Sequence, residues 1–155
     1  MHILFSIDSL QQGGAEQSIA HIIRHFSADT SVTILYFYPK DSTPTCTLES
    51  CNLRDNYKPL AKAGFEVIGV SADDVKSHEK FATKQSLPFS LIADTDRELI
   101  EAYEAWGEKS MYGKKYMGII RKTFVIDEKG KIAAIIEKVD AKNHAKQILD
   151  ALQNG

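Results

Sequence analysis

Short apolar runs alternate with segments of helical periodicity along this chain, and that alternation restricts the possible folds more than any other feature. Four runs are predicted as buried strands: residues 2–7, 32–38, 65–70 and 89–93. Helical patterns fill the intervals, at residues 15–26, 48–63 and 75–85. Repeated strand–helix–strand units are typical of a parallel sheet with helices packed on its faces. The order of elements therefore predicts an α/β fold.

The pattern changes after the fourth strand. Asp94 opens a short helix, and residues 106–117 form a polar stretch rich in lysine, glycine and tyrosine that we predict to be a solvated loop. Two further strands, 119–126 and 132–138, flank a turn at residues 127–130 and predict a hairpin. A last helix follows, with its apolar residues on one face. A hairpin brings an antiparallel pair, so the predicted sheet is mixed.

The only two cysteines of the chain, Cys46 and Cys51, lie where the second strand passes into a helix. Backbone N–H groups and the positive end of the helix dipole point toward a side chain at such a turn, and they favour thiolate over thiol. The thiolate is the form of cysteine that attacks peroxides, disulfides and carbonyls. This position makes the pair a candidate for redox chemistry.

The spacing of the two cysteines adds a constraint. If both lie on one helix, their Cα atoms are roughly 8–9 Å apart, whereas a disulfide tolerates no more than about 7 Å. A reaction between them therefore requires the first turns of the helix to unwind. The alternative interpretation is structural, because free cysteine is among the residue types most often buried. No Cys/His cluster has zinc spacing, and His78 and His144 each stand alone in helical segments, so no metal is predicted.

The segment around the cysteines resembles the active-site region of the peroxiredoxins, and most closely the bacterioferritin-comigratory, or Q-type, thiol peroxidases. The pattern Pro-x-x-x-Thr-x-x-Cys of that group is met by Pro39, Thr43 and Cys46, and its second cysteine by Cys51. One departure is Thr45, where glycine is usual, and its side chain narrows the approach to Cys46. Further similar segments follow in the same order, at residues 69–73, 87–94, 106–109 and 118–127. The resemblance implies a thioredoxin-like three-layer sandwich with a mixed central sheet.

The resemblance also implies a chemistry, the reduction of hydrogen peroxide and organic hydroperoxides. Cys46 would attack the peroxide, and Cys51 would then form an intramolecular disulfide with it. Arg121 would stabilise the thiolate and hold the peroxide, the Thr43 hydroxyl would hydrogen-bond thiolate or substrate, and Pro39 would shield the cysteine from solvent. A thioredoxin-like dithiol would reduce the disulfide. No metal, flavin or nucleotide cofactor is implied.

The N-terminal segment, residues 1–35, departs from this resemblance, which covers roughly residues 33–153. The family begins with an extended hairpin, whereas this chain has a predicted strand–loop–helix unit with a glycine pair in the loop. Residues 3–18 look like the opening of a two-Rossmann-domain glycosyltransferase, although nothing downstream supplies a nucleotide-sugar domain. The glycine pair is also explained by a tight turn before a helix. One hypothesis is a chimera, natural or constructed, joined near residues 36–40.

Two alternatives to the peroxidase follow from that segment. In one, the chain is a catalytically impaired hybrid that keeps only the fold. In the other, residues 1–35 keep a glycosyltransferase-like ability to bind a ligand. A general dithiol oxidoreductase is disfavoured, because the chain has no Cys-x-x-Cys pair.

Size and charge set the remaining expectations. A length of 155 residues predicts one domain spanning residues 1–155. The net charge of −2 gives no indication of a nucleic-acid or anionic-membrane partner. No apolar run approaches the length of about 18 residues typical of a membrane span, and no signal-peptide pattern opens the chain. We expect a cytoplasmic monomer, since reactive cysteines suit a reducing compartment.

Overall fold

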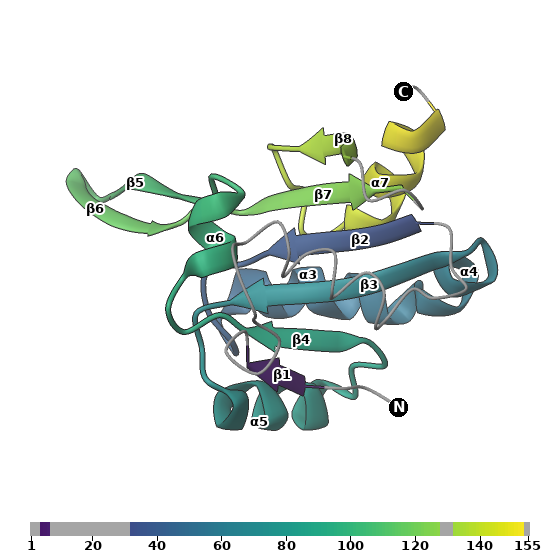
Figure 1. Ribbon diagram of the computed structural model, residues 1–155, viewed down its shortest axis with the longest axis horizontal. Coiled ribbons are helices and arrows are strands. Elements are labelled where there is room, and N and C mark those ends of the chain that lie inside the picture. Colours follow the sequence, from purple (N-terminus) through teal and green to yellow (C-terminus); the bar gives the residue numbers. More distant parts are fainter. Residues whose placement is uncertain (1–3, 7–31, 128–131, 154–155) are drawn as a thin grey trace.

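The computed structural model describes residues 4–6, 32–127 and 132–153, which contain a six-stranded mixed sheet (Figure 1). Four neighbouring strands run parallel, in the order β1 (Leu4–Ser6), β4 (Ser90–Ala93), β3 (Phe65–Ser71) and β2 (Val32–Phe37). Two antiparallel strands complete the sheet, β7 (Lys122–Ile126) beside β2 and β8 (Ile132–Ile136) at the edge. The predicted mixed α/β sheet is confirmed.

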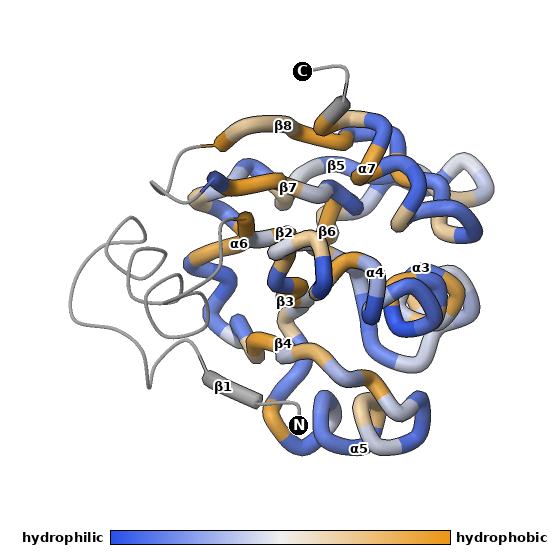
Figure 2. Tube along the Cα trace, turned by 90° about the vertical axis from the view of Figure 1, so that its right-hand side faces the viewer, coloured by the Kyte–Doolittle hydropathy of each residue, from blue (hydrophilic) through white to orange (hydrophobic). Residues whose placement is uncertain are grey.

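Alternate residues of β2 face two separate apolar layers. Ile34 and Tyr36 pack on one face with residues of α3 (Pro44–Asp55), α4 (Tyr57–Lys62), α5 (Val75–Gln85) and α7 (His144–Gln153). Leu35 and Phe37 pack on the other face, where α6 (Glu98–Ala102) contributes Leu99. Seen along the sheet, the larger helices lie on one side and α6 on the other (Figure 2). The strand period of two thus builds the three layers.

The helix that carries the cysteines differs from its predicted bounds of 48–63. It begins at Pro44, because proline has a φ suited to the first helical position and lacks an N–H that would go unpaired there. It ends at Asp55, and α4 starts after Asn56. Pro59 explains the break, since its ring would clash with the carbonyl four residues earlier in a continuous helix. Both Cys46 and Cys51 therefore lie within α3.

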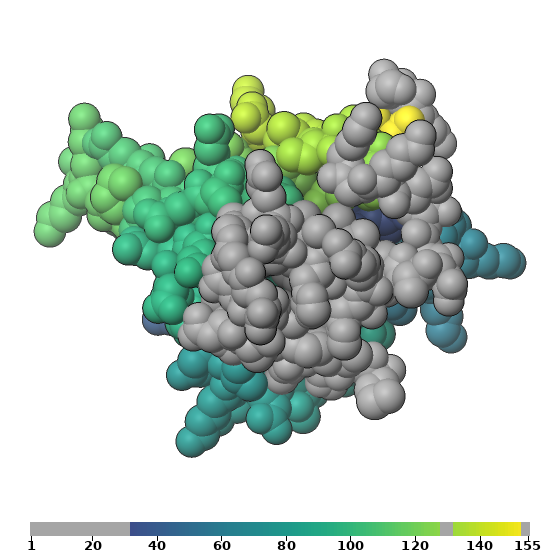
Figure 3. Space-filling model, in the orientation of Figure 1, coloured from purple at the N-terminus to yellow at the C-terminus, as the bar shows by residue number. Residues whose placement is uncertain are grey.

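The predicted loop at residues 106–117 is wrong. These residues form a two-stranded antiparallel ribbon, β5 (Trp106–Met111) and β6 (Lys114–Ile119), which projects from the body of the protein (Figure 3). Tyr112 and Gly113 make the turn with φ values of 51° and 80°. Positive φ at both central residues is the signature of a tight hairpin turn. The predicted strand 119–126 is accordingly divided, with Ile119 in β6 and residues 122–126 in β7.

Other predicted elements agree or fall outside the described residues. The strand at 2–7 is confirmed over β1, which pairs in parallel with β4 at the edge of the sheet. The helix at 15–26 and its preceding glycine loop lie outside the described residues, as does most of the turn at 127–130. Among the helices that are described, none is long and apolar enough to cross a membrane.

Candidate active site

The first turn of α3 carries a buried thiol. The side chain of Cys46 is 1% exposed and lies two residues after Pro44. Thr43 precedes the helix in an extended conformation, and its carbonyl accepts the first helical hydrogen bond from the Thr47 N–H at 2.8 Å. The backbone N–H groups of the helical residues that precede Thr47 have no acceptor within the helix. The Cys46 sulfur therefore lies near unpaired backbone donors.

Arg121 lies next to this sulfur although 75 positions separate the two residues. It lies two residues after β6 and immediately before β7, whose first residue pairs with the last residue of β2. Its Nη2 donates to Cys46 Sγ at 3.0 Å, and its Nη1 donates to Glu49 Oε1 at 2.5 Å. The guanidinium thus bridges the thiol and a carboxylate one helical turn further along α3.

Burial and charge act against each other on Arg121. Burial disfavours its charge, but Glu49 and Cys46 outweigh that effect and raise the pKa of the guanidinium above its usual value. A second cation, Lys109 of β5, is partly buried nearby and donates from Nζ to the Ile119 carbonyl at 2.9 Å. Its pKa is lowered, first by burial and then by the charge of Arg121. The electrostatic surroundings of Cys46 are therefore cationic.

Glu49 is fully buried, and burial raises the pKa of its carboxyl from 4.5 to about 7 despite the pairing with Arg121. Its second oxygen, Oε2, has no hydrogen-bond partner among the described residues and lies 3.4 Å from His144 Nε2. His144 begins α7 and is also fully buried. Burial lowers the pKa of this histidine from 6.5 to about 4, so the ring is neutral at neutral pH.

Hydrogen bonds fix the tautomer of that neutral ring. Gln147 Oε1 accepts from the Asp140 N–H at 2.6 Å, while its amide nitrogen donates to the Lys138 carbonyl at 2.9 Å. His144 Nδ1 lies 3.0 Å from the same Oε1 and must be the donor there. His144 Nε2 is then an acceptor, and it accepts from the Thr123 hydroxyl, whose Oγ1 lies 2.7 Å away.

Cys51 lies on the same helix in a different environment. It is partly exposed, and its Sγ donates to Gln85 Oε1 of α5 at 3.3 Å. Both cysteines are free. Their separation of five helical residues corresponds to roughly 8–9 Å between Cα atoms, too far for a disulfide. The geometry agrees with the expectation that the pair can bridge only after α3 unwinds.

A buried cluster of hydrogen-bonded side chains joins the loop before α3 to α5. His78 Nδ1 lies 2.7 Å from Asp41 Oδ2, and its Nε2 lies 2.9 Å from the Ile92 carbonyl. The ring of His78 thus lies between the loop, through Asp41, and β4, through Ile92. Asp73 accepts from the Asp41 N–H at 2.8 Å. Ligand-type atoms of Asp41, Asp73 and His78 all lie within 4.8 Å of one another, and these hydrogen bonds account for their proximity.

Of the five residues predicted for the site, Cys46 and Arg121 are in direct contact. Thr43 caps α3, and its hydroxyl donates to the Lys40 carbonyl at 3.0 Å. Pro39 is half-buried in the loop after β2, and Cys51 faces α5. Sequence reasoning missed the partly buried Lys109 and the buried residues behind the site: Glu49, His144, and the His78–Asp41 pair. The two histidines do not stand alone as predicted, because each meets a carboxylate that is distant in sequence.

Comparison with known proteins decides the family. The profile of the AhpC/TSA family matches residues 11–135. The chain belongs to the AhpC/TSA family. Peroxiredoxin Bcp of Bacillus subtilis is 44% identical over 78% of this chain and 77% of its own length. The Escherichia coli peroxiredoxin Bcp is 43% identical over 77% of each chain. The structure of Xanthomonas campestris peroxiredoxin Q has a TM-score of 0.73 at 41% identity, covering 79% of this chain and 78% of that one.

The protein is therefore a peroxiredoxin of the Bcp type, with the thioredoxin-like fold of that family, and its activity is that of a thiol-dependent peroxidase. The matched region of this peroxiredoxin begins at residue 11, inside the segment that resembles a glycosyltransferase. Neither alternative drawn from that segment, an impaired hybrid or a sugar-nucleotide site, gains support from these relatives.

Proposed function

We propose that Cys46 is the peroxidatic cysteine of this peroxiredoxin and that Cys51 is the resolving cysteine. The observation that carries the proposal is the hydrogen bond from Arg121 Nη2 to the buried Cys46 sulfur at 3.0 Å. A guanidinium at this distance favours the thiolate and offers donors to a negatively charged peroxide oxygen. Cys51 carries no comparable cation contact, since its sulfur donates to Gln85.

The proposed cycle has three steps. The Cys46 thiolate attacks one peroxide oxygen, the O–O bond breaks, and the departing oxygen takes a proton and leaves as water or alcohol. The resulting sulfenic acid reacts with the Cys51 thiol, forming a disulfide and releasing water. A dithiol protein of the thioredoxin type then reduces the disulfide and is itself oxidised. The substrates are hydrogen peroxide and organic hydroperoxides, and no metal or organic cofactor takes part.

Supporting roles follow from the surroundings of Cys46. The backbone N–H groups at the start of α3 supply donors for the developing charge on the peroxide. The Thr43 hydroxyl reaches the substrate after rotating away from the Lys40 carbonyl, to which it donates in the reduced protein. Pro39, half-buried in the loop after β2, would exclude water from the thiolate.

All of these groups belong to one chain, so we propose that a monomer is competent and that residues 1–155 form one domain. A reducing compartment such as the cytoplasm suits a cycle that returns both cysteines to the thiol form. Size-exclusion chromatography combined with peroxidase assays across a concentration series tests the monomer. Specific activity should not change with protein concentration.

The experiment that tests the cysteine roles is intact-mass analysis after one equivalent of hydrogen peroxide. The wild type should lose two hydrogens as the disulfide forms. Cys51→Ser should gain one oxygen as sulfenic acid, and Cys46→Ser should not react on the same timescale. Slow, equal oxidation of both cysteines in the wild type would refute the assignment.

A further inference from the structure

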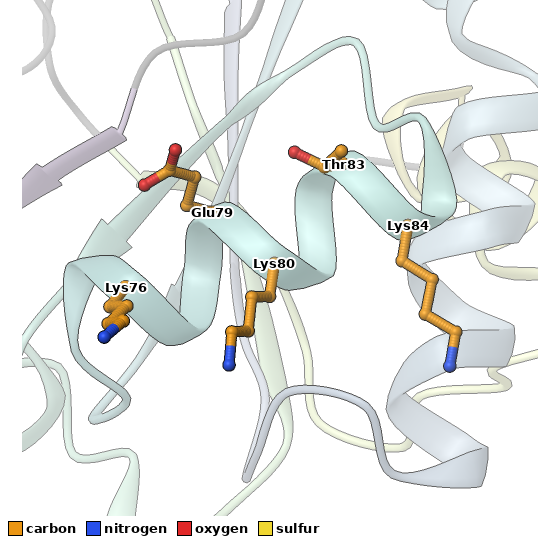
Figure 4. A pocket seen from close by; sticks show the side chains of 5 residues that line it. All are labelled: Lys76, Glu79, Lys80, Thr83 and Lys84. Carbon is orange, nitrogen blue, oxygen red and sulfur yellow. The ribbon is translucent and has the colours of Figure 1, made fainter.

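The exposed face of α5 carries a row of lysines beside the resolving cysteine. Lys76, Lys80 and Lys84 are spaced four residues apart and are all exposed. Figure 4 shows the three side chains on one side of the helix, whereas Glu79 and Thr83 lie on the other. Among the described residues, no carboxylate lies within ion-pair distance of these three ammonium groups. The row therefore presents three ammonium groups without an ion-pair partner in the described part of the chain, although the carboxyl groups of Asp74 and Glu79 line the same depressions.

This lysine row borders a hollow that reaches the active-site helix. A depression of about 530 Å³ lies between α5 and α3, and its lining includes Lys84, Gln85 and Cys51. Pro44 and Leu48 of α3 supply its apolar part, and Leu48 is 47% exposed. Two further depressions continue from it along α5, past Lys80 to Lys76. An apolar centre with a charged rim is the usual composition of a transient protein interface.

The size of this surface argues for a protein rather than a peroxide. Eight residues of helix separate Lys76 from Lys84, a span of roughly 12 Å. A small peroxide needs only to reach the Cys46 sulfur beside Arg121, and Arg121 lines none of the three depressions. The lysines thus lie on the Cys51 side of α3, where a reductant must approach.

We propose that the groove between α3 and α5 is the docking surface for the dithiol protein that reduces the Cys46–Cys51 disulfide, and that this partner bears carboxylates opposite Lys76, Lys80 and Lys84. The inference rests on the proposed function, because it requires that disulfide. The lysine row is basic although the net charge of the chain is −2, so a partner with an acidic surface would be complementary to it. Such rim charges act mainly by raising the association rate.

The groove also fixes the direction of the exchange. A partner thiolate that enters beside Lys84 attacks Cys51 Sγ, forms a mixed disulfide and releases the Cys46 thiolate. Arg121 stabilises that leaving thiolate at its 3.0 Å contact once the helix re-forms. The second thiol of the partner then attacks the partner's own bridged sulfur and releases the Cys51 thiol. The partner departs as a disulfide, having supplied two electrons. Unwinding of α3 displaces the part of the groove wall that Pro44 and Leu48 form, but it leaves the lysines in place on α5, so the basic side of the groove is also present in the disulfide form.

The test compares two reductants on the full-length chain. One is thioredoxin with an acidic face, and the other is dithiothreitol, an uncharged dithiol too small to span the lysine row. Peroxidase turnover is measured for wild type, for the double variant Lys80→Glu/Lys84→Glu, and for a control, Lys58→Glu/Lys62→Glu. The control changes the net charge equally, with the same four-residue spacing, on exposed positions of α4 that do not line the groove.

At low ionic strength the groove variant should lose about tenfold or more in kcat/KM for thioredoxin, while the control loses no more than about threefold. The difference should shrink as salt is added, and turnover with dithiothreitol should be equal in all three proteins. Equal losses in both charge variants, or none, would overturn the docking surface while leaving the peroxidase intact. Failure of the wild type to turn over with dithiothreitol would overturn the proposed function and this inference together.

Discussion

Glu49→Gln offers the sharpest quantitative test of the buried network behind Cys46. Burial raises the pKa of the Glu49 carboxyl in the folded protein from 4.5 to about 7. The folded state therefore holds this proton more tightly than the unfolded state does. Its contribution to stability is fully present below pH 4.5 and is lost as the pH rises through 7. Glutamine has nearly the same shape but no proton to lose, so the variant lacks this pH-dependent loss.

The magnitude follows from the two pKa values. Between pH 5 and pH 8, ionisation of Glu49 lowers the free energy of unfolding of the wild type by about 2–3 kcal/mol. The stability of Glu49→Gln relative to wild type should therefore improve by about that amount over the same interval. At pH 5 Glu49 is protonated, so the substitution replaces one neutral hydrogen-bonding group with another. At pH 8 it also removes the negative partner of Arg121, and the effect of that partner is already contained in the folded-state pKa of about 7. The His144 contribution is common to both proteins, since burial is the main cause of its lowered pKa.

Urea titrations at pH 5, 6, 7 and 8 measure the effect, with Glu101→Gln on the exposed surface of α6 as the matched control. The free energy of unfolding of the control should change with pH in the same way as that of the wild type. If the free energies of unfolding of Glu49→Gln and wild type differ by the same amount at every pH, the pKa of Glu49 is not raised in the folded protein. The account of a Glu49 carboxyl that takes up its proton more readily because it is buried would then be wrong.

Three further changes probe contacts around the site. His144→Gln should remove a pH dependence of opposite sign, because burial lowers the pKa of this histidine to about 4. The free energy of unfolding of the wild type should fall by about 2 kcal/mol between pH 7 and pH 4.5, and that of the variant should not. Urea unfolding measures the difference. Gly69→Ala should cost about 1–3 kcal/mol in the same assay, because a Cβ would lie 2.7 Å from Leu91 and 2.8 Å from the ring of Tyr36. Asn52→Ala should lower the free energy of unfolding by about 1–2 kcal/mol, because Asn52 Oδ1 accepts from the Ala145 N–H at the start of α7. Asn52→Asp keeps that acceptor and should lower it by less.

The sheet was predictable from the sequence because its signal is local. The strands at 32–38, 65–70 and 89–93 are nearly continuous apolar runs, each with one polar residue, as is typical of strands covered on both faces. The β5–β6 ribbon gave no such signal, because its residues are mostly exposed and polar, so no alternation of apolar and polar residues marks it as strand. Its turn has positive φ at Tyr112 and Gly113, but tyrosine is not a residue from which such a turn would be predicted.

The candidate site was predictable only where one motif contains it. Pro39, Thr43, Cys46 and Cys51 fall within thirteen residues of one another, so their spacing could be matched to a family pattern. Arg121 was reached through that resemblance and not through spacing. The pairing of Glu49 with His144 joins the middle of α3 to the start of α7, and it depends on where the packing of those helices brings two side chains. No sequence period records such a contact.

The same contacts explain how one helix can be both ordered and ready to unwind. The far end of α3 is held by the buried Leu53 and by Asn52, whose side chain bonds the chain at Lys142 and Ala145. The near end is held by the charge-assisted contact from Arg121 to Cys46. In the proposed cycle, oxidation turns the thiolate into a neutral sulfenic acid and weakens that contact. The reaction therefore loosens the turns that must open, and we expect the side-chain bonds of Asn52 to limit how far the unwinding spreads.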